Sequence, residues 1–253
     1  MDIGVSTSAW PELLLDRALE RIAALAGSAE IRSFGLHTLL SRRSRHAVIA
    51  SGLRCSVHGP FGNAGLGTTS ETRRLTALDE QRRHLEAAAE VGATAYVAHP
   101  DWSPDPRRRD PAVVAALERS FLALRELQDA GGVPVLVENM PGRGLSHFTH
   151  PGDLDLQGLG LILDVGHASI SGCLDDWLAR PMAPLRHVHL HDNRGAGDVA
   201  DPHLALGAGV IDAAAVLAAA RAAGASMVLE HDNEPDVLAS LAHLRRLGLL
   251  TPS

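Results

Sequence analysis

The sequence predicts an α/β protein, a single (β/α)8 barrel with a metal site at its carboxyl-terminal mouth. Three observations lead to this prediction: the chain has 253 residues, short apolar runs alternate with helical patterns, and side chains that bind metals follow the apolar runs. About 250 residues is the usual length of one such barrel and leaves no room for another full domain. We therefore expect residues 1–253 to form one domain.

Short apolar runs, mostly of aliphatic and β-branched residues, are the expected strands. Strands of a parallel sheet are buried on both faces, so they read as continuous apolar runs and not as alternating ones. The expected strands are, in order, 3–5, 30–35, 55–58, 95–99, 135–138, 161–164, 188–191 and 227–230. They make up the eight strands that a closed barrel requires.

Helical patterns lie between these runs. The expected helices are 11–25, 42–50, 70–91, 111–130, a short segment near 150–155, then 174–178, 212–223 and 235–247. Pro11 and Pro111 fit the first turn of a helix, and Gly92, Gly131 and Gly224 mark helix ends. Alternating strands and helices imply right-handed β-α-β units and one closed sheet.

Imidazoles and carboxylates close or follow the apolar runs. The carboxyl ends of the strands of such a barrel meet at one mouth, which is where this fold places its chemistry. The candidate metal ligands are His58, His99, Glu138, Asp164, His167, His189, Asp201, His203 and Glu230. We expect these side chains to face one another.

A bound cation is the simplest partner for the carboxylates in this set. Glu138, Asp164 and Glu230 each close an apolar run, and a buried carboxylate is costly unless it is paired or bound to a cation. The chain contains no lysine, and imidazoles end the neighbouring runs. Mixed nitrogen and oxygen ligands suit zinc, manganese, cobalt or iron, and argue against Cu(I) or calcium. We expect one to three divalent ions.

Composition excludes several other classes of function. All 23 residues counted as Lys+Arg are arginine, which excludes Schiff-base chemistry. A net charge of -7 gives no overall basic surface for nucleic acid. No apolar run reaches about eighteen residues, and no signal segment precedes the first run, so we expect a soluble, cytoplasmic protein. Cys55 and Cys173 form no disulfide framework, in agreement with a reducing compartment.

The chain resembles the xylose-isomerase-like superfamily of TIM barrels, which joins sugar isomerases and epimerases with endonuclease IV. The resemblance covers nearly the whole chain and rests on the segments SVHGPFGN, AHPDW, VENMPG, LDVGHAS, HLHDN, DPHLALGAGVID and VLEHDN. For the sugar branch it implies a single ion held by Glu138, Asp164, His189 and Glu230. The two glutamates would also move a proton at the substrate carbon, while His167 and an arginine would hold substrate oxygens.

For the endonuclease IV branch the same resemblance implies three ions and cleavage of abasic DNA. His58, His99 and a shared Glu138 would bind the second ion, and a third would be held by His167, Asp201 and His203. All these ligand types are present. The residues around these ligands nevertheless favour the sugar branch. The segment IGVSTSA lacks the histidine of the endonuclease G-x-H-V-S pattern, and ENMPG and DVGH stand where endonucleases have E-N-T-A-G and D-T-C-H.

The favoured function is therefore a metal-dependent isomerase or epimerase, or a related dehydratase. Its substrate would be a small sugar, a sugar phosphate or another hydroxylated carbonyl compound. The candidate substrate-contacting residues are His167, Arg143, Arg194, Trp102 and Phe61. Endonuclease IV-like phosphodiesterase activity and a non-catalytic sugar- or metal-binding barrel remain alternatives, and a homo-oligomer remains open as the state of assembly.

Two further histidines share a face of the strand that carries His189. His187, His189 and His191 alternate along it, so all three point to the barrel interior. We expect His187 to be structural and His191, with Asp192, to orient the imidazoles that bind metal. Phe61 and Trp102 are the residues expected to offer a wedge against DNA.

Overall fold

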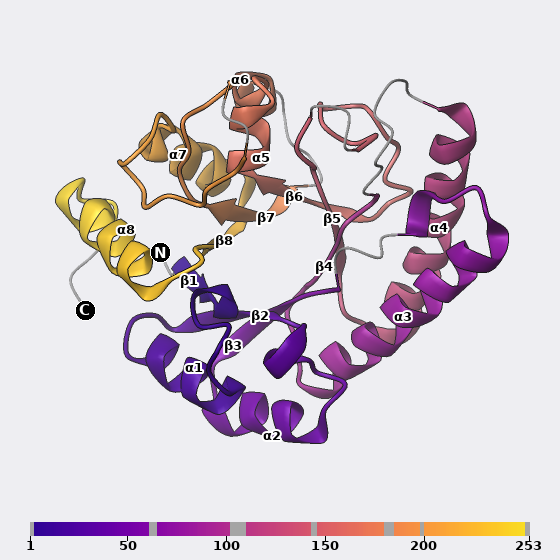
Figure 1. Ribbon diagram of the computed structural model, residues 1–253, viewed down its shortest axis with the longest axis horizontal. Helices are drawn as coiled ribbons and strands as arrows, with labels where there is room; N and C mark the ends of the chain where they lie inside the picture. The colour runs from indigo at the N-terminus through magenta and orange to yellow at the C-terminus, as the bar shows by residue number, and fades with distance from the viewer. Residues whose placement is uncertain are drawn as a thin grey trace.

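Eight parallel strands form a closed barrel in chain order, which confirms the predicted fold (Figure 1). The computed structural model describes residues 3–60, 65–101, 110–142, 146–179, 185–197 and 200–250. The strands are β1 (Ile3–Ser6), β2 (Ser28–Arg32), β3 (Arg54–His58), β4 (Tyr96–Ala98), β5 (Val135–Glu138), β6 (Gly160–Asp164), β7 (Leu185–Leu190) and β8 (Ser226–Leu229). Strand β8 pairs with β1 and so closes the sheet.

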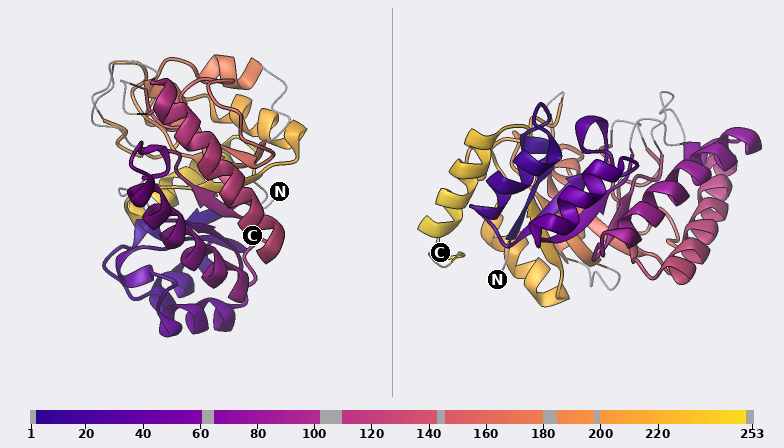
Figure 2. Two further views of the ribbon diagram at one scale, coloured as in Figure 1. Left: turned by 90° about the vertical axis from the view of Figure 1, so that its right-hand side faces the viewer. Right: turned by 90° about the horizontal axis from the view of Figure 1, so that it is seen from below.

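Helices surround the barrel on its outside (Figures 1 and 2). They are α1 (Leu15–Ala23), α2 (Arg42–Ser51), α3 (Glu71–Glu90), α4 (Pro111–Gly131), α5 (Val165–Ile170), α6 (Leu174–Ala179), α7 (Ala213–Ala223) and α8 (Glu234–Arg246). Short 3-10 helices follow three of the strands: η1 (Thr7–Ala9), η2 (Gly35–His37) and η3 (Gly65–Gly67). No helix in the described ranges is both long enough and apolar enough to cross a membrane.

Local signals account for several of the helix ends. The Asp110 carboxylate accepts a hydrogen bond from Ala112 N at 2.8 Å, and Pro111 occupies the first turn of α4. Gly132 and Gly224 end α4 and α7 with φ of +75° and +68°. These left-handed conformations cost a glycine little, because it has no Cβ.

Three expected elements differ from the structure. Helix α1 starts at Leu15 and not at Pro11, because residues after η1 form turns first. Strand β2 ends at Arg32, so Phe34 lies in the loop that follows and is 61% exposed. The expected helix near 150–155 is a turn in which Asp153 accepts hydrogen bonds from the backbone of Thr149 and His150. Helix α5 instead follows β6 directly.

The core has an apolar layer between strands and helices and a polar layer inside the barrel. Tyr96, Phe121 and Leu124 are fully buried in the outer layer. Inside, Glu30 from β2 and His187 from β7 are also buried. The polar layer therefore lies directly beneath the strand ends that carry the candidate ligands.

His84 on α3 makes stability sensitive to pH. Its Nδ1 lies 2.9 Å from Ser33 Oγ, and burial followed by the charge of Arg83 lowers the pKa of His84 from 6.5 to about 4. A histidine whose pKa is lowered by folding stabilises the fold fully above its unfolded pKa and loses that contribution as pH falls toward the folded value. Between pH 6.5 and pH 4, we expect this group to cost about 1–2 kcal/mol of unfolding free energy, since solvent around the helix screens part of the effect.

Denaturant unfolding of His84→Gln at both pH values measures this contribution. The variant should lose less stability than the wild type on acidification, whereas His46→Gln, at an exposed position of α2, should follow the wild type. Equal losses in all three proteins would contradict the prediction.

Candidate metal centre

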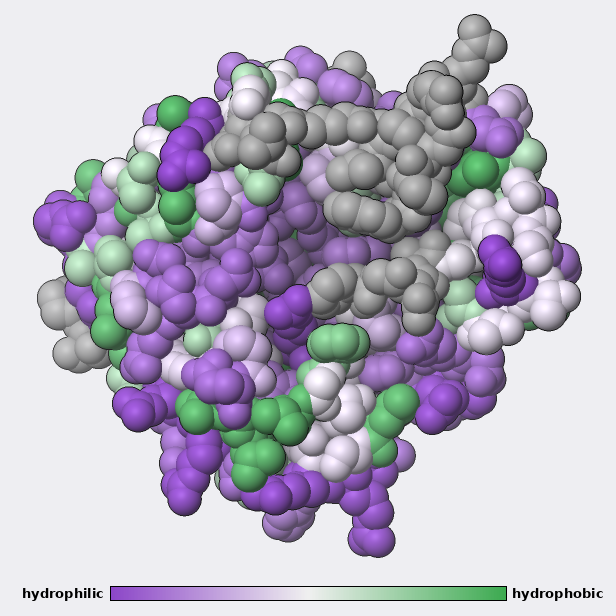
Figure 3. Space-filling model, viewed as in Figure 1, coloured by the Kyte–Doolittle hydropathy of each residue, from purple (hydrophilic) through white to green (hydrophobic). Residues whose placement is uncertain are grey.

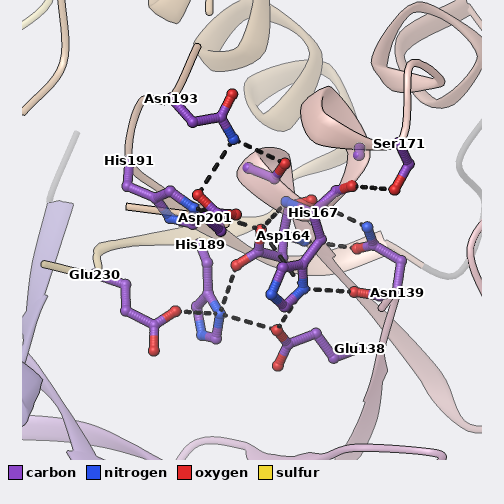
Figure 4. A network of polar contacts seen from close by, with 12 residues as sticks. Glu138, Asn139, Asp164, His167, Ser171, His189, His191, Asn193, Asp201 and Glu230 are labelled. Atoms are coloured by element: carbon purple, nitrogen blue, oxygen red, sulfur yellow. Dashed lines mark hydrogen bonds and ion pairs between the residues drawn. The ribbon is translucent and has the colours of Figure 1, made fainter. Parts of the chain in front are cut away.

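The strand ends bring the predicted ligands to one place, the carboxyl-terminal mouth of the barrel. Figure 4 shows Glu138, Asp164, His167, His189, Asp201 and Glu230 there. His58, Glu138 and Asp164 are the last residues of β3, β5 and β6. His189 lies within β7, and His99 and Glu230 directly follow β4 and β8. The remaining three come from other segments: His167 from α5, and Asp201 and His203 from the segment between β7 and α7.

Three carboxylates surround one imidazole nitrogen. His189 Nδ1 lies 2.9 Å from Glu230 Oε2, 3.6 Å from Asp164 Oδ2 and 3.7 Å from Glu138 Oε1. Donor atoms that share a tetrahedral ion at about 2.0–2.1 Å stand roughly 3.3 Å apart. The spacing of these atoms therefore fits a divalent ion between them.

Glu30 determines the tautomer of His189, and therefore whether the nitrogen that faces the other three carboxylates carries a proton or a lone pair. Its Oε1 lies 2.7 Å from His189 Nε2, and an ionised carboxylate only accepts, so Nε2 carries the proton. In that neutral tautomer Nδ1 is an acceptor, and neither Nδ1 nor Asp164 Oδ2 has a hydrogen-bond partner among the described residues. Lone pairs directed at one another in a buried site call for a cation between them.

Without such a cation, protonated imidazole is the other way to balance the charge. Burial lowers the pKa of His189, but the charges of Glu230 and Glu30 outweigh it and raise that pKa well above its usual value. For Glu138, burial raises the pKa, and the imidazoles of His99 and His189 nevertheless hold it well below its usual range. The site therefore requires positive charge in either state, and these residues suit a divalent ion.

Glu30 is a site residue that the sequence did not identify. Its carboxylate also accepts from Ser56 Oγ at 2.9 Å and lies 3.1 Å from His187 Nε2, whose ring meets Ser226 Oγ at 2.6 Å. Burial raises the pKa of Glu30, but the nearby histidines hold it well below its usual range. His187 thus contacts Glu30 from below, and the structural role expected for it stays a prediction.

Exchange of Glu30 for glutamine should weaken metal binding without removing a ligand. The amide can no longer accept from Ser56 and both imidazoles at once, so His189 loses the partner that fixes its tautomer. Carboxylates that orient a ligand histidine in this way commonly contribute 10–100-fold in affinity. We expect a loss of about that size in zinc affinity, measured by competition with a chelating dye, and an unchanged affinity would contradict it. Glu12→Gln, at an exposed position, is the control.

A second group of donors shares Glu138. Its Oε2 lies 3.1 Å from His99 Nε2 and 3.4 Å from His58 Nε2, whereas Oε1 faces His189. His58 Nδ1 lies 2.8 Å from Gly59 O and donates to it, so the lone pair of the neutral ring is on Nε2, the nitrogen that faces Glu138 Oε2. The two oxygens of Glu138 thus face different imidazoles, as in a carboxylate that bridges two ions.

His167 and Asp164 are tied to the ends of β5 and β6. Asp164 Oδ1 accepts from His167 N at 2.7 Å and so caps α5, while His167 Nδ1 donates to Asn139 O at 2.9 Å. Asn139 also pairs with the backbone of Asp164, through Oδ1 at 2.7 Å and Nδ2 at 3.0 Å. This explains the Glu-Asn and Asp-x-x-His spacings. Glu138, Asp164 and His167 offer ligand atoms within 4.8 Å of one another.

Asp201 and His203 gather around a different histidine from the one expected. His191, Asp201 and His203 offer ligand atoms that lie within 4.8 Å of one another. His191 Nε2 is 3.1 Å from Asp201 Oδ2, and the rings of His191 and His203 stack with centroids 4.2 Å apart. The sequence associated Asp201 and His203 with His167 and gave His191 a supporting role.

The candidate substrate-contacting residues are only partly described. Arg194 is exposed in the loop after β7, while Phe61, Trp102 and Arg143 lie outside the described residues. The structure adds Phe34 and Leu36, which are 61% and 51% exposed in the loop after β2. Hydrophilic residues lie at the bottom of the hollow in the middle of the face shown in Figure 3. The mouth thus combines a polar interior with apolar groups in one of its loops.

Comparison with known proteins places these features in a family. The model of the xylose isomerase-like TIM barrel family matches residues 22–247. An uncharacterized protein of Methanocaldococcus jannaschii is 29% identical over 217 residues, which is 84% of each chain. A probable endonuclease 4 of Mycobacterium marinum is 30% identical over 200 residues, covering 73% of this chain and 75% of the relative.

Solved structures give a similar range. A D-tagatose 3-epimerase-like protein superimposes with a TM-score of 0.81 at 26% identity, covering 97% of this chain and 96% of the other. A Thermus thermophilus protein from a crystal soaked with zinc chloride gives a TM-score of 0.74 at 29% identity, and the superposition covers 100% of both chains. Similarity therefore extends to proteins of both the epimerase and the endonuclease type.

Proposed function

Because this chain belongs to the xylose isomerase-like TIM barrel family, we propose that it is a divalent-metal-dependent isomerase or epimerase of a small sugar, sugar phosphate or related hydroxylated carbonyl compound. One observation carries the proposal: Glu138 and Glu230, which lie on either side of His189 in Figure 4, both direct a carboxylate at the same nitrogen. That arrangement suits two groups that hold one ion and act on one substrate carbon.

A divalent ion held by Glu138, Asp164, His189 and Glu230 would polarise adjacent carbonyl and hydroxyl oxygens and so acidify the neighbouring C–H. The carboxylates of Glu138 and Glu230 are ionised at neutral pH, because nearby imidazoles hold their pKa values well below the usual range against the effect of burial. One carboxylate can therefore take the proton at one face of the carbon, and the other can return a proton at the opposite face. The result is inversion or carbonyl migration.

Other residues would position the substrate. His167 keeps its Nδ1 on Asn139 O, which leaves Nε2 for a substrate oxygen or a further ion. Arg194 follows β7 at the mouth and would suit a phosphate or carboxylate. If the substrate carries a leaving group next to the acidified carbon, the same carboxylates would eliminate water, so dehydration is a closely related outcome.

A phosphodiesterase like endonuclease IV is the second candidate, favoured by one observation. Glu138 Oε2 faces the imidazoles of His58 and His99, which a single-ion epimerase does not require. Two or three ions about 3.5–4 Å apart activate water and stabilise a phosphoryl group during displacement. The net charge of -7 and the missing histidine in the first strand weigh against DNA as the substrate.

The deciding experiment compares the two reactions directly. Zinc- or manganese-loaded protein is incubated with ketoses and their phosphates in deuterated water, and separately with duplex DNA that contains one abasic site. We expect metal-dependent deuterium incorporation next to the carbonyl and no strand cleavage. Catalytic cleavage that Glu138→Gln abolishes, without deuterium incorporation, would replace the proposal by the second candidate.

The number of ions is a separate prediction. Beyond the site at His189, we expect the groups around His58 with His99 and around Asp201 with His203 to bind at least one further ion. Calorimetric titration of metal-free protein with zinc should show more than one binding event. A single stoichiometric event that Asp164→Asn abolishes would contradict this expectation.

A further inference from the structure

His191 lies in direct contact with candidate ligand atoms and not in a second layer outside them. It directly follows β7 and is fully buried. Its Nε2 is 3.1 Å from Asp201 Oδ2 and 3.7 Å from Asp164 Oδ1 (Figure 4). Its ring stacks on that of His203 with an interplanar angle of 25°. Donor atoms around one ion have separations of about this size. These contacts connect Asp164, at the His189 site, with Asp201 and His203.

We propose that His191 is a direct ligand of a divalent ion, in a site that it forms with Asp201 and His203. The inference rests on the proposed function in one respect, namely that the mouth binds metal. It goes beyond that function because His191 is outside the ligand set that the sequence resemblance implies. An ion in this position would have two imidazoles and one carboxylate as ligands, a donor set that suits zinc.

Asp201 is oriented so that one oxygen remains for the ion. Asn193 Nδ2 donates to Asp201 Oδ1 at 3.2 Å and to Gly166 O at 2.9 Å (Figure 4). This amide therefore fixes Asp201 against the start of α5. Oδ2 is then the oxygen that faces His191. Ligand carboxylates are commonly held in this way by a partner outside the ion's own ligands.

The backbone next to this site is packed too closely for a side chain. A Cβ at Gly166 would lie 1.8 Å from His191 Nε2 and 2.4 Å from Asp201 Oδ2. Glycine in the Asp-Val-Gly-His segment thus allows His191 and Asp201 to approach each other over the first turn of α5. Any larger residue at position 166 would displace His191 or Asp201.

His203 is held in a backbone conformation that side chains other than glycine seldom adopt. Its φ is +46°, in the left-handed region. His231 Nδ1 donates to His203 O at 2.9 Å, and His231 Nε2 accepts from Ser240 Oγ of α8 at 2.8 Å. Such strain concentrates at functional sites, where the surroundings fix it. Here the fixed backbone places the His203 ring on that of His191.

The alternative is that His191 only donates a hydrogen bond that orients Asp201. His191→Asn separates the two roles, because the asparagine amide still offers a donor but is a poor zinc ligand. Zinc content per chain after gel filtration and zinc affinity by competition with a chelating dye are measured for wild type, His191→Asn and Asp201→Asn. His46→Asn on the surface of α2 is the control, and circular dichroism verifies folding.

We expect His191→Asn and Asp201→Asn each to lose the same single equivalent of zinc, or to bind that equivalent roughly 100-fold or more weakly. The double variant should lose only that one equivalent, because both residues bind the same ion. Zinc content and affinity of His191→Asn within about 10-fold of wild type would overturn the assignment and leave the His189 site intact. A wild type that binds no zinc would overturn both this inference and the proposed function. If His191→Asn does not fold, His191→Gln is measured in its place.

Cobalt(II) gives a readout on the ligands themselves. Each imidazole that binds the ion changes the visible absorption of the cobalt-loaded protein. We expect the absorption of the fully cobalt-loaded protein to change in His191→Asn and to remain as in wild type in His46→Asn. An unchanged spectrum in His191→Asn would contradict direct coordination.

Discussion

Glu230→Gln is expected to lower turnover roughly 1000-fold, because it removes a proton-transfer group and a negatively charged ligand in one exchange. The strand should remain intact, since Glu230 N donates to Leu190 O at 3.1 Å through the backbone. The rate of deuterium incorporation, the zinc content and the melting temperature are measured on the same preparation. The zinc-loaded variant should keep nearly the melting temperature of the wild type, although its rate of deuterium incorporation falls.

Glu234→Gln is the matched control for that variant. Glu234 lies four positions further along, at the start of α8, and accepts from Trp10 Nε1 at 3.0 Å, which glutamine can also do. Its rate should stay within about twofold of wild type, as expected for a substitution away from the site. A Glu230→Gln enzyme that reacts at a similar rate would show that Glu230 is neither base nor ligand.

Asp192→Ala should be the most destabilising single change in the segment that carries Asp201 and His203. The buried carboxylate accepts from the backbone N–H groups of Asn193 and Ile211 through Oδ1 and of Gly207 and Gly209 through Oδ2, each at 2.9 Å. Alanine leaves these buried donors unpaired, and we expect a loss of about 3–5 kcal/mol in unfolding free energy.

Denaturant unfolding of the metal-free protein measures that loss. Asp212→Ala serves as the comparison, because Asp212 also accepts from two backbone N–H groups but only caps α7 at the surface. Removal of such a cap costs about 1 kcal/mol. Similar losses in the two variants would show that Asp192 does not organise the segment. Zinc content should fall in Asp192→Ala by the equivalent that we propose for the site of His191, Asp201 and His203.

Much of the fold, and the positions of the candidate ligands, were predictable because both depend on short stretches of sequence. Each strand is an apolar run, and a polar side chain at the carboxyl end of a barrel strand is expected to face the mouth, so His58, Glu138 and Asp164 could be placed from position alone. The start of α1 could not, because a proline at the first turn of a helix and a proline in a preceding turn look alike. In the structure Pro11 lies in the turn.

The remaining site residues depend on contacts between distant parts of the chain. Glu30 meets His187 and His189, which lie 157 and 159 positions further along, so no local pattern indicates its role. His191 falls on the same strand face as His189, but its partners Asp201 and His203 come from a segment whose path is fixed by Asp192 and Gly209. A Cβ at Gly209 would lie 2.0 Å from Asn193 O, a proximity that only the folded segment shows.

The candidate ligands are distributed unevenly around the mouth. The nine predicted ligands and His191 come from β3 to β8 and the segments that follow these strands. In the described part of the chain β1 and β2 contribute none of these, and Glu30 of β2 lies below, beside His187 and His189. The loops after these two strands, with Trp10 and the exposed Phe34 and Leu36, are therefore separate in sequence from the ligands. Exchange of loops 7–14 and 33–41 between relatives should alter which substrate is accepted and leave metal binding unchanged. New substrate specificities could therefore be selected in these two loops without changing the residues that we propose to bind metal.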